Sequence, residues 1–165
     1  MKKIISIMLI VVASLTCVIP TTTLAANNTE DYTYFTQEEF QALNPIYAEY
    51  EENSNARATG LIIRKNLAIA KNGSSLVISG YTYGSSEVVK CGFEEVVIQR
   101  RASTSASWSD YKIYEDLYSE STKYTLNKSL TVATGYQYRV TAIHYAKKSL
   151  FSTQKIEVAT GYLTF

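Results

Sequence analysis

Apolar residues are concentrated first near the start of the chain, in a run that follows two lysines. Lys2 and Lys3 precede the largely apolar stretch 4–20, and mostly small residues follow in 21–26 (Thr-Thr-Thr-Leu-Ala-Ala). A positive start, a short apolar core and small residues before a cleavage point are the three parts of a secretory signal peptide. We therefore predict a signal peptide over residues 1–26, a secreted protein, and no membrane span once the signal is removed.

A helical pattern follows in an acidic segment. Thr36 and Glu39 have the spacing of a capping box, in which each side chain accepts a hydrogen bond from the other residue's backbone amide. Phe35 and Phe40 flank this box at the spacing of a hydrophobic staple. These features predict a short helix that begins at Thr36.

Asn44–Pro45 interrupts this helix, because a proline disfavours a helical residue before it but suits the first turn of a new helix. We expect the apolar positions of 46–50 to form a second helical turn. The polar stretch 51–59 has the composition of a linker. Residues 27–58 are therefore expected to be an acidic helical leader and linker, ahead of a domain over 59–165.

From Gly60 onward the pattern changes to short runs rich in β-branched and aromatic residues, separated by polar turns. Asn72–Gly73 is a dipeptide typical of a tight hairpin turn. The runs that predict strands are 61–69, 76–83, 88–101, 108–117, 124–132, 136–146 and 150–164. Seven short strands at regular spacing favour an antiparallel sandwich or barrel over a parallel sheet.

One stretch within these runs, 130–144, has a more specific pattern. Leu130 lies six residues before Tyr136, across a turn that contains Gly135. The stretch resembles the corner before the F strand of fibronectin type III and immunoglobulin-like sandwiches, where a tyrosine hydroxyl bonds back to the upstream backbone. The resemblance implies that Tyr136 is the corner tyrosine and Leu130 its core partner.

By this resemblance the fold is all-β: a seven-stranded antiparallel immunoglobulin- or fibronectin-III-like sandwich preceded by a short N-terminal helix. The second strand departs from the pattern. Such modules usually carry a core tryptophan in that strand, and this chain has Gly80.

Four further stretches carry a second resemblance: 97–101 (Val-Ile-Gln-Arg-Arg), 108–111 (Trp-Ser-Asp-Tyr), 135–140 (Gly-Tyr-Gln-Tyr-Arg-Val) and 144–147 (His-Tyr-Ala-Lys). In these the body is similar to a group of small secreted proteins of clostridial Gram-positive bacteria, a domain of unknown function. No activity is established for that group, so the resemblance implies fold and export but no mechanism.

The overall charge of +1 conceals an uneven distribution. Residues 27–58 contain seven acidic residues and one basic residue, whereas 59–165 contain thirteen basic and eight acidic residues. Such asymmetry fits a leader that packs on a basic body, and it equally fits a solvated tail. No block is basic enough for a nucleic-acid-binding patch, so we expect no nucleic-acid partner.

The two cysteines leave two questions of processing and reactivity. Cys17, inside the apolar run, allows a lipoprotein as an alternative, although that processing prefers a smaller residue than Thr16 before the cysteine. After signal removal Cys91 is the only cysteine, so no intramolecular disulfide can form. We expect Cys91 to be a small buried apolar residue, with a reactive thiol or an intermolecular disulfide as the alternative.

The mature chain offers little catalytic or metal-binding chemistry. His144 and Cys91 are its only histidine and cysteine, and no flanking motif supports them as a nucleophile and its base. The adjacent acidic pairs Glu94–Glu95 and Glu115–Asp116 point to opposite faces of their strands, which leaves paired-carboxylate chemistry only across strands. No cluster has zinc or calcium spacing. We therefore expect no enzyme, no cofactor and no metal.

Candidate ligand-binding residues lie in the fourth expected strand. Trp108, Tyr114 and Tyr118 share one face by alternation, and we expect the opposite, more aliphatic face of 111–117 to point to the core. An exposed aromatic stripe suits a sugar ring or a protein partner. The alternative is that Trp108 caps the sandwich and the tyrosines are ordinary cross-strand pairs.

The functional prediction is therefore a secreted, non-enzymatic interaction or adhesion-type module at the cell surface, either free or associated with the cell wall, with a cell-wall glycan or an extracellular protein as ligand. The basic pairs Arg100–Arg101 and Lys147–Lys148 would favour an anionic cell-wall polymer, and they equally fit an ordinary solvated surface. An alternative is a secreted antagonistic or toxin-like factor that its acidic leader masks.

Overall fold

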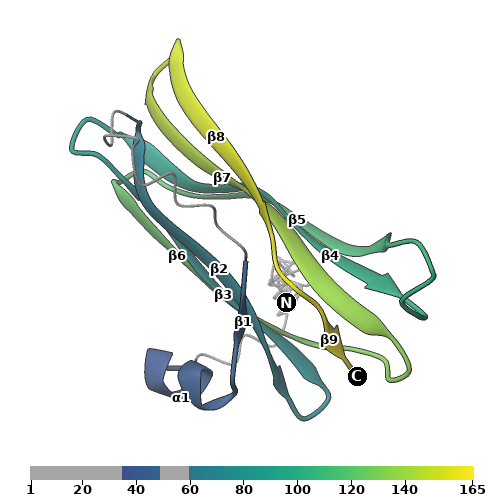
Figure 1. Ribbon diagram of the computed structural model, residues 1–165. Helices are drawn as coiled ribbons and strands as arrows, with labels where there is room; N and C mark the ends of the chain where they lie inside the picture. The colour runs from purple at the N-terminus through teal and green to yellow at the C-terminus, as the bar shows by residue number, and fades with distance from the viewer. Residues whose placement is uncertain (1–34, 49–59) are drawn as a thin grey trace, which may run out of the picture.

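Two antiparallel β-sheets pack face to face in the computed structural model, which describes residues 35–48 and 60–165 (Figure 1). Its strands are β1 (Ile46–Tyr47), β2 (Ile62–Asn72), β3 (Ser75–Gly84), β4 (Lys90–Arg101), β5 (Ser109–Ser119), β6 (Lys123–Thr131), β7 (Gln137–Ser149), β8 (Ser152–Ala159) and β9 (Leu163–Thr164). One short helix, α1 (Gln37–Ala42), precedes these strands. The predicted signal peptide 1–26, with Cys17, and the predicted linker 51–59 lie outside the described residues.

Strands that are distant in the sequence lie side by side in each sheet. The first sheet has the order β1–β2–β3–β6, and the second has the order β5–β4–β7–β8, with β9 also paired to β7. All of these pairings are antiparallel. The chain crosses between the sheets after β3, after β5 and after β6, so the two sheets enclose a shared core (Figure 1).

The predicted all-β, antiparallel sandwich with a short helix in front is confirmed. Each predicted run overlaps one of the strands β2 to β8. The run 150–164 also includes the two-residue strand β9, and the two-residue strand β1 lies outside all of the runs. The predicted hairpin is present, but its two turn residues are Gly73 and Ser74, because Asn72 still belongs to β2 and pairs with Ser75. Gly73 has a φ of 58°. Only a residue that tolerates positive φ fits such a tight turn without strain.

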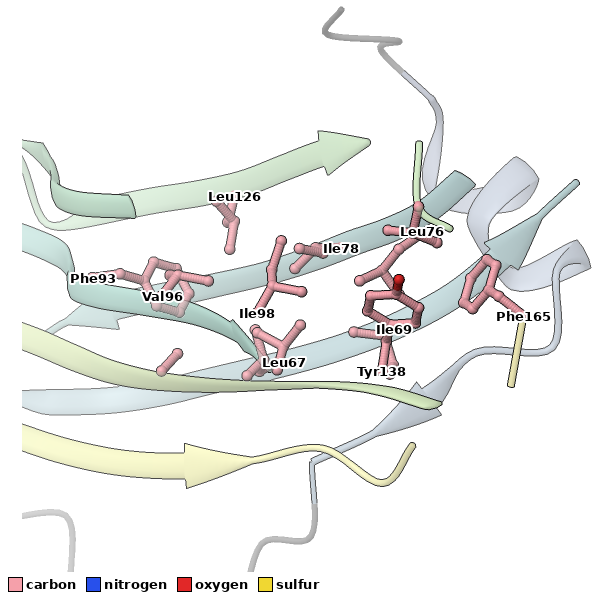
Figure 2. Close-up of a cluster of buried hydrophobic side chains, with 13 residues drawn as sticks. Leu67, Ile69, Leu76, Ile78, Phe93, Val96, Ile98, Leu126, Tyr138 and Phe165 are labelled. Carbon is pink, nitrogen blue, oxygen red and sulfur yellow. The ribbon is translucent and has the colours of Figure 1, made fainter. Parts of the chain in front are cut away.

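Alternation along the strands determines which side chains reach the core. In β7, Tyr138, Val140 and Ala142 are buried, whereas the intervening Arg139 and Thr141 keep part of their surface in solvent. Figure 2 shows the main cluster, to which both sheets contribute; its labelled members are Leu67, Ile69, Leu76, Ile78, Phe93, Val96, Ile98, Leu126, Tyr138 and Phe165.

Gly80 in β3 has a packing reason for lacking a side chain. A Cβ at this position would lie 2.7 Å from the carbonyl oxygen of Asn66 and 3.1 Å from Cζ of Phe93. The ring of Phe93, which comes from the opposite sheet, therefore lies against the backbone of β3. This contact leaves no room for the core tryptophan that fibronectin type III modules usually carry in this strand.

The predicted start of the helix is confirmed in detail. The backbone amide of Glu39 donates to Thr36 Oγ1 (3.1 Å), and the amide of Thr36 donates to Glu39 Oε2 (2.6 Å). The rings of Phe35 and Phe40 stack with their centres 5.4 Å apart. Two backbone amide groups at the N-terminus of the helix thereby gain hydrogen-bond acceptors, and the contact between the two rings stabilises the first turn.

The helix docks on the outer face of the first sheet through Phe40. This side chain is buried in a small cluster with Ala68, Ala70 and Val77, whose short side chains leave space for its ring. The described part of the leader is therefore joined to the sandwich by apolar contact. It lies on the first sheet and not on the second.

The predicted second helical turn over 46–50 is wrong in its described part, because residues 46 and 47 form strand β1. Asn44 has a φ of 54°, which ends the helix, and Pro45 then favours an extended continuation. Ile46 pairs with Ile69 of β2, so this part of the leader extends the first sheet by one short strand.

Candidate functional site

Strand β5 was expected to present one aromatic face to solvent, but its alternation is interrupted. Tyr114 and Leu117 both pack against the main core, although they are three residues apart. Asp116 lies between them with a φ of 56°, and this local irregularity moves the following residues to the opposite face. A second irregularity, the register shift between β4 and β5 at Ile98/Gln99, separates Trp108 from Tyr114. No continuous stripe therefore joins the three predicted residues.

Trp108, just before β5, lies beside two arginines from neighbouring strands. Arg139 lies between the core residues Tyr138 and Val140, so its side chain leaves from the outer face of the second sheet. Its guanidinium carbon lies 4.6 Å from the centre of the Trp108 ring, and that of Arg101 lies 4.3 Å from it. Both distances are within the range of a cation–π interaction.

Tyr162 completes this group. Its ring centre lies 6.4 Å from that of Trp108, and the guanidinium of Arg101 lies 5.0 Å from it. Tyr162 keeps 43% of its surface exposed, whereas the other three residues are half-buried. We call Arg101, Trp108, Arg139 and Tyr162 the outer-face cluster.

Hydrogen bonds hold both arginines of the cluster in place. Arg101 Nε donates to Gln137 Oε1 (2.8 Å), and its Nη1 donates to the carbonyl oxygen of Thr104 (3.2 Å). Arg139 Nε donates to Gln99 Oε1 (2.8 Å), and the amide nitrogen of Gln99 donates to Asp110 (2.8 Å). Each guanidinium therefore uses its Nε on a neutral amide. Within the described residues no carboxylate forms a salt bridge with either arginine.

Sequence reasoning singled out Trp108 as an aromatic ligand-binding residue and Arg101 as part of a basic pair, but it did not bring the two together. It missed Arg139 and Tyr162. Arg139 gives only one signal in the sequence, a polar position that alternates with core positions. The pairing of β4 with β7, which places Gln99 opposite Arg139, brings the run that contains Arg101 next to the run that contains Arg139. That register is a long-range property and is not visible in either run alone.

The remaining two predicted ligand-binding residues have other surroundings. Tyr118 stacks on Tyr145 with ring centres 4.8 Å apart, and Lys90 Nζ lies 4.5 Å from its ring centre. Burial, with the nearby carboxylates adding to it, raises the pKa of Tyr118 to about 12. Tyr114 packs against the core, and Lys128 Nζ lies 4.3 Å from its ring centre.

The hydroxyl bond expected of Tyr136 is made by Tyr138. The Tyr138 hydroxyl donates to the carbonyl oxygen of Ala133 (3.1 Å), five residues upstream, and the ring is fully buried. Tyr136 and Leu130 are partly buried and pack against the same core. Both tyrosines lie on one face of the strand, so alternation alone could not decide between them.

His144 and Cys91 are both buried, and each is bonded to Thr82. Thr82 Oγ1 donates to the carbonyl oxygen of Gly92 (2.8 Å), so His144 Nδ1, at 2.7 Å, must donate to Oγ1. The His144 Nε2 atom is then an unprotonated, buried nitrogen that has no hydrogen-bond partner among the described residues. Burial, with a smaller contribution from Lys65, lowers the pKa of His144 to about 3.

The surroundings of Cys91 do not suit a catalytic nucleophile. Its Sγ lies 3.4 Å from the carbonyl oxygen of Thr82, and burial raises the pKa of the thiol. A catalytic cysteine needs a lowered pKa and access to substrate, and this buried thiol has neither. The two residues together stabilise the packing between the sheets.

Comparison with protein-family models, curated proteins and solved structures found no match to this chain. Among residues 35–48 and 60–165, no group of three or more metal-ligating side chains is present. The same residues contain no helix with the length and hydropathy of a membrane span.

Proposed function

We propose that the protein is a secreted, non-enzymatic interaction module that binds a partner through the outer-face cluster. The observation that carries the proposal is the pair of arginines, Arg101 and Arg139, held over Trp108 by neutral amides and bound to no carboxylate of the described residues. Tryptophan, tyrosine and arginine are the residues most often found to dominate binding energy in protein interfaces.

The cluster is organised before any partner arrives. Arg101 and Arg139 each make side-chain hydrogen bonds that fix the guanidinium plane over the indole ring. Binding therefore loses less side-chain entropy than it would with mobile arginines. A stacked guanidinium also keeps outward N–H groups that can bind a carboxylate in a bidentate manner.

The ligand chemistry that best fits is a carboxylate on an acidic partner surface. Two guanidinium groups over Trp108 reduce the indole surface on which a neutral sugar ring would stack. An acidic protein segment therefore suits the cluster better than a neutral glycan. An acidic glycan presents the same carboxylates and is distinguished from a protein by experiment.

Immobilised polyglutamate, polygalacturonate and neutral dextran would test this proposal with recombinant protein that lacks residues 1–26. We expect binding to an acidic polymer that Arg139→Gln weakens about tenfold, which corresponds to one lost charge-assisted hydrogen bond. Binding should also weaken in high salt, and dextran should bind least.

Arg64→Gln is the matched control, because it removes the same charge from a residue stacked on Tyr81 and Tyr83 of the first sheet. The control should bind as the wild type does. The proposal fails if neither acidic polymer binds, or if Arg64→Gln weakens binding as much as Arg139→Gln.

We also propose that the sandwich is of the immunoglobulin or fibronectin type III kind. Among the longer strands, the first, second and fifth share one sheet and the third, sixth and seventh share the other, as A, B, E and C, F, G do in immunoglobulin domains. The fourth, β5, joins the latter sheet. The bond from Tyr138 near the start of β7 to upstream Ala133 has the form of a tyrosine corner and also supports this assignment.

A further inference from the structure

The turn between β7 and β8 exposes two large apolar side chains that the fold does not use. Ser149 pairs with Ser152, so Leu150 and Phe151 form a two-residue turn. Leu150 is 81% exposed and Phe151 is 98% exposed. Turns of this length normally contain glycine, asparagine or aspartate, and an isolated exposed phenylalanine adds nothing to stability.

This turn is the tip of a projecting hairpin. The pairing of β7 with β4 ends at Lys147, beside which Val89 bonds to the Lys147 carbonyl, so the residues after it extend past the neighbouring strand. Figure 1 shows the β7–β8 hairpin reaching beyond the other loops at its end of the sandwich. Val89 is itself 53% exposed and adds an apolar side chain near the base of the tip.

The charge around the tip is positive. Lys147, Lys148 and Lys155 belong to the hairpin, and the sequence between Lys147 and Lys155 contains no acidic residue. Lys148 pairs with Glu87 (2.7 Å) and Lys155 with Glu94 (2.6 Å), both outside the hairpin. These two lysines are therefore neutralised by glutamates. Lys147 adds a net positive charge next to the apolar pair.

We propose that this hairpin tip inserts Leu150 and Phe151 into the interfacial region of an anionic lipid bilayer. Apolar side chains backed by lysines are the combination that binds such surfaces, by burial of the apolar groups and attraction to anionic headgroups. A two-residue convex tip presents far less area than a stable protein interface requires, whereas a bilayer needs no matching pocket. This surface is separate from the outer-face cluster and does not depend on it.

Co-sedimentation with vesicles tests the proposal on the protein without residues 1–26. We expect binding to vesicles that contain equal parts phosphatidylglycerol and phosphatidylcholine, and weaker binding to phosphatidylcholine alone. A Leu150→Ser, Phe151→Ser double variant should lose at least tenfold in partitioning, since both side chains leave the apolar phase. Lys147→Gln should lose roughly fivefold on the anionic vesicles only.

Ile113→Ser is the matched control, because Ile113 is also exposed but lies on β5, away from the tip. It should bind as the wild type does. The proposal is overturned if the wild type ignores anionic vesicles, or if the double variant binds as well as the wild type. It is equally overturned if the tip leaves vesicles unbound but can be cross-linked at position 151 to a protein partner.

Fluorescence separates insertion from adsorption by charge. Trp108, the one tryptophan of the chain, lies outside the hairpin and gives the baseline emission. A Phe151→Trp variant should show an additional blue shift with anionic vesicles and should be quenched by brominated lipid. Binding without that shift would show that the tip stays in water, and would overturn the insertion.

Discussion

At the scale of single residues, His144 makes the stability of the folded protein depend on pH. Its pKa is about 3 in the folded protein, because of burial, against about 6.5 when unfolded. Below pH 6.5 the unfolded chain takes up a proton that the folded protein resists, so stability falls as the pH drops from about 6.5 to about 3. We expect this residue to lower the free energy of unfolding by about 2 kcal/mol between pH 7 and pH 5. Urea titrations at both pH values measure the change.

His144→Leu isolates this contribution from that of the carboxylates. The variant cannot be protonated, and Thr82 can still donate to the carbonyl oxygen of Gly92. Its free energy of unfolding should therefore change less than that of the wild type over the same pH interval. Identical pH profiles for the two proteins would contradict the assignment.

At the scale of elements, Phe40 is the buried side chain through which helix α1 packs on the first sheet, and Phe35 and Leu43 pack beside it. Phe40 fills a space between Ala68, Ala70 and Val77, so Phe40→Ala leaves a cavity at this contact. We expect a loss of about 3 kcal/mol in the free energy of unfolding, measured in urea. Thr36→Ala removes only the cap and should cost about 1 kcal/mol.

Glu38→Gln serves as the control, because this exposed residue makes no part of the capping box. It should change stability by less than about 0.5 kcal/mol. A Phe40→Ala variant as stable as the wild type would mean that the helix is not docked in solution.

At the scale of the whole molecule, the sequence predicted what depends on local alternation and missed what depends on register. The strands, the hairpin turn at Gly73 and the capping box each have a local pattern, and all are present. The outer-face cluster depends on the pairing of β4 with β7 and on the register shift between β4 and β5 at Ile98/Gln99, which no short run of residues encodes. The upstream hydroxyl bond was expected two residues early, at Tyr136, because Tyr136 and Tyr138 share one face of the strand.

The order of strands in the two sheets also has a consequence for how the chain folds. The hairpins β2–β3, β4–β5 and β7–β8 join neighbours in the sequence, whereas β3–β6 and β4–β7 join strands from different parts of it. Hairpins form early, and pairing of distant strands must await closure of long loops. Closure of the sandwich should therefore be the slow event, on the order of milliseconds to seconds. Until it occurs, the central strands β3 and β4 each keep one unpaired edge, and newly synthesised chains are most prone to aggregate in that interval.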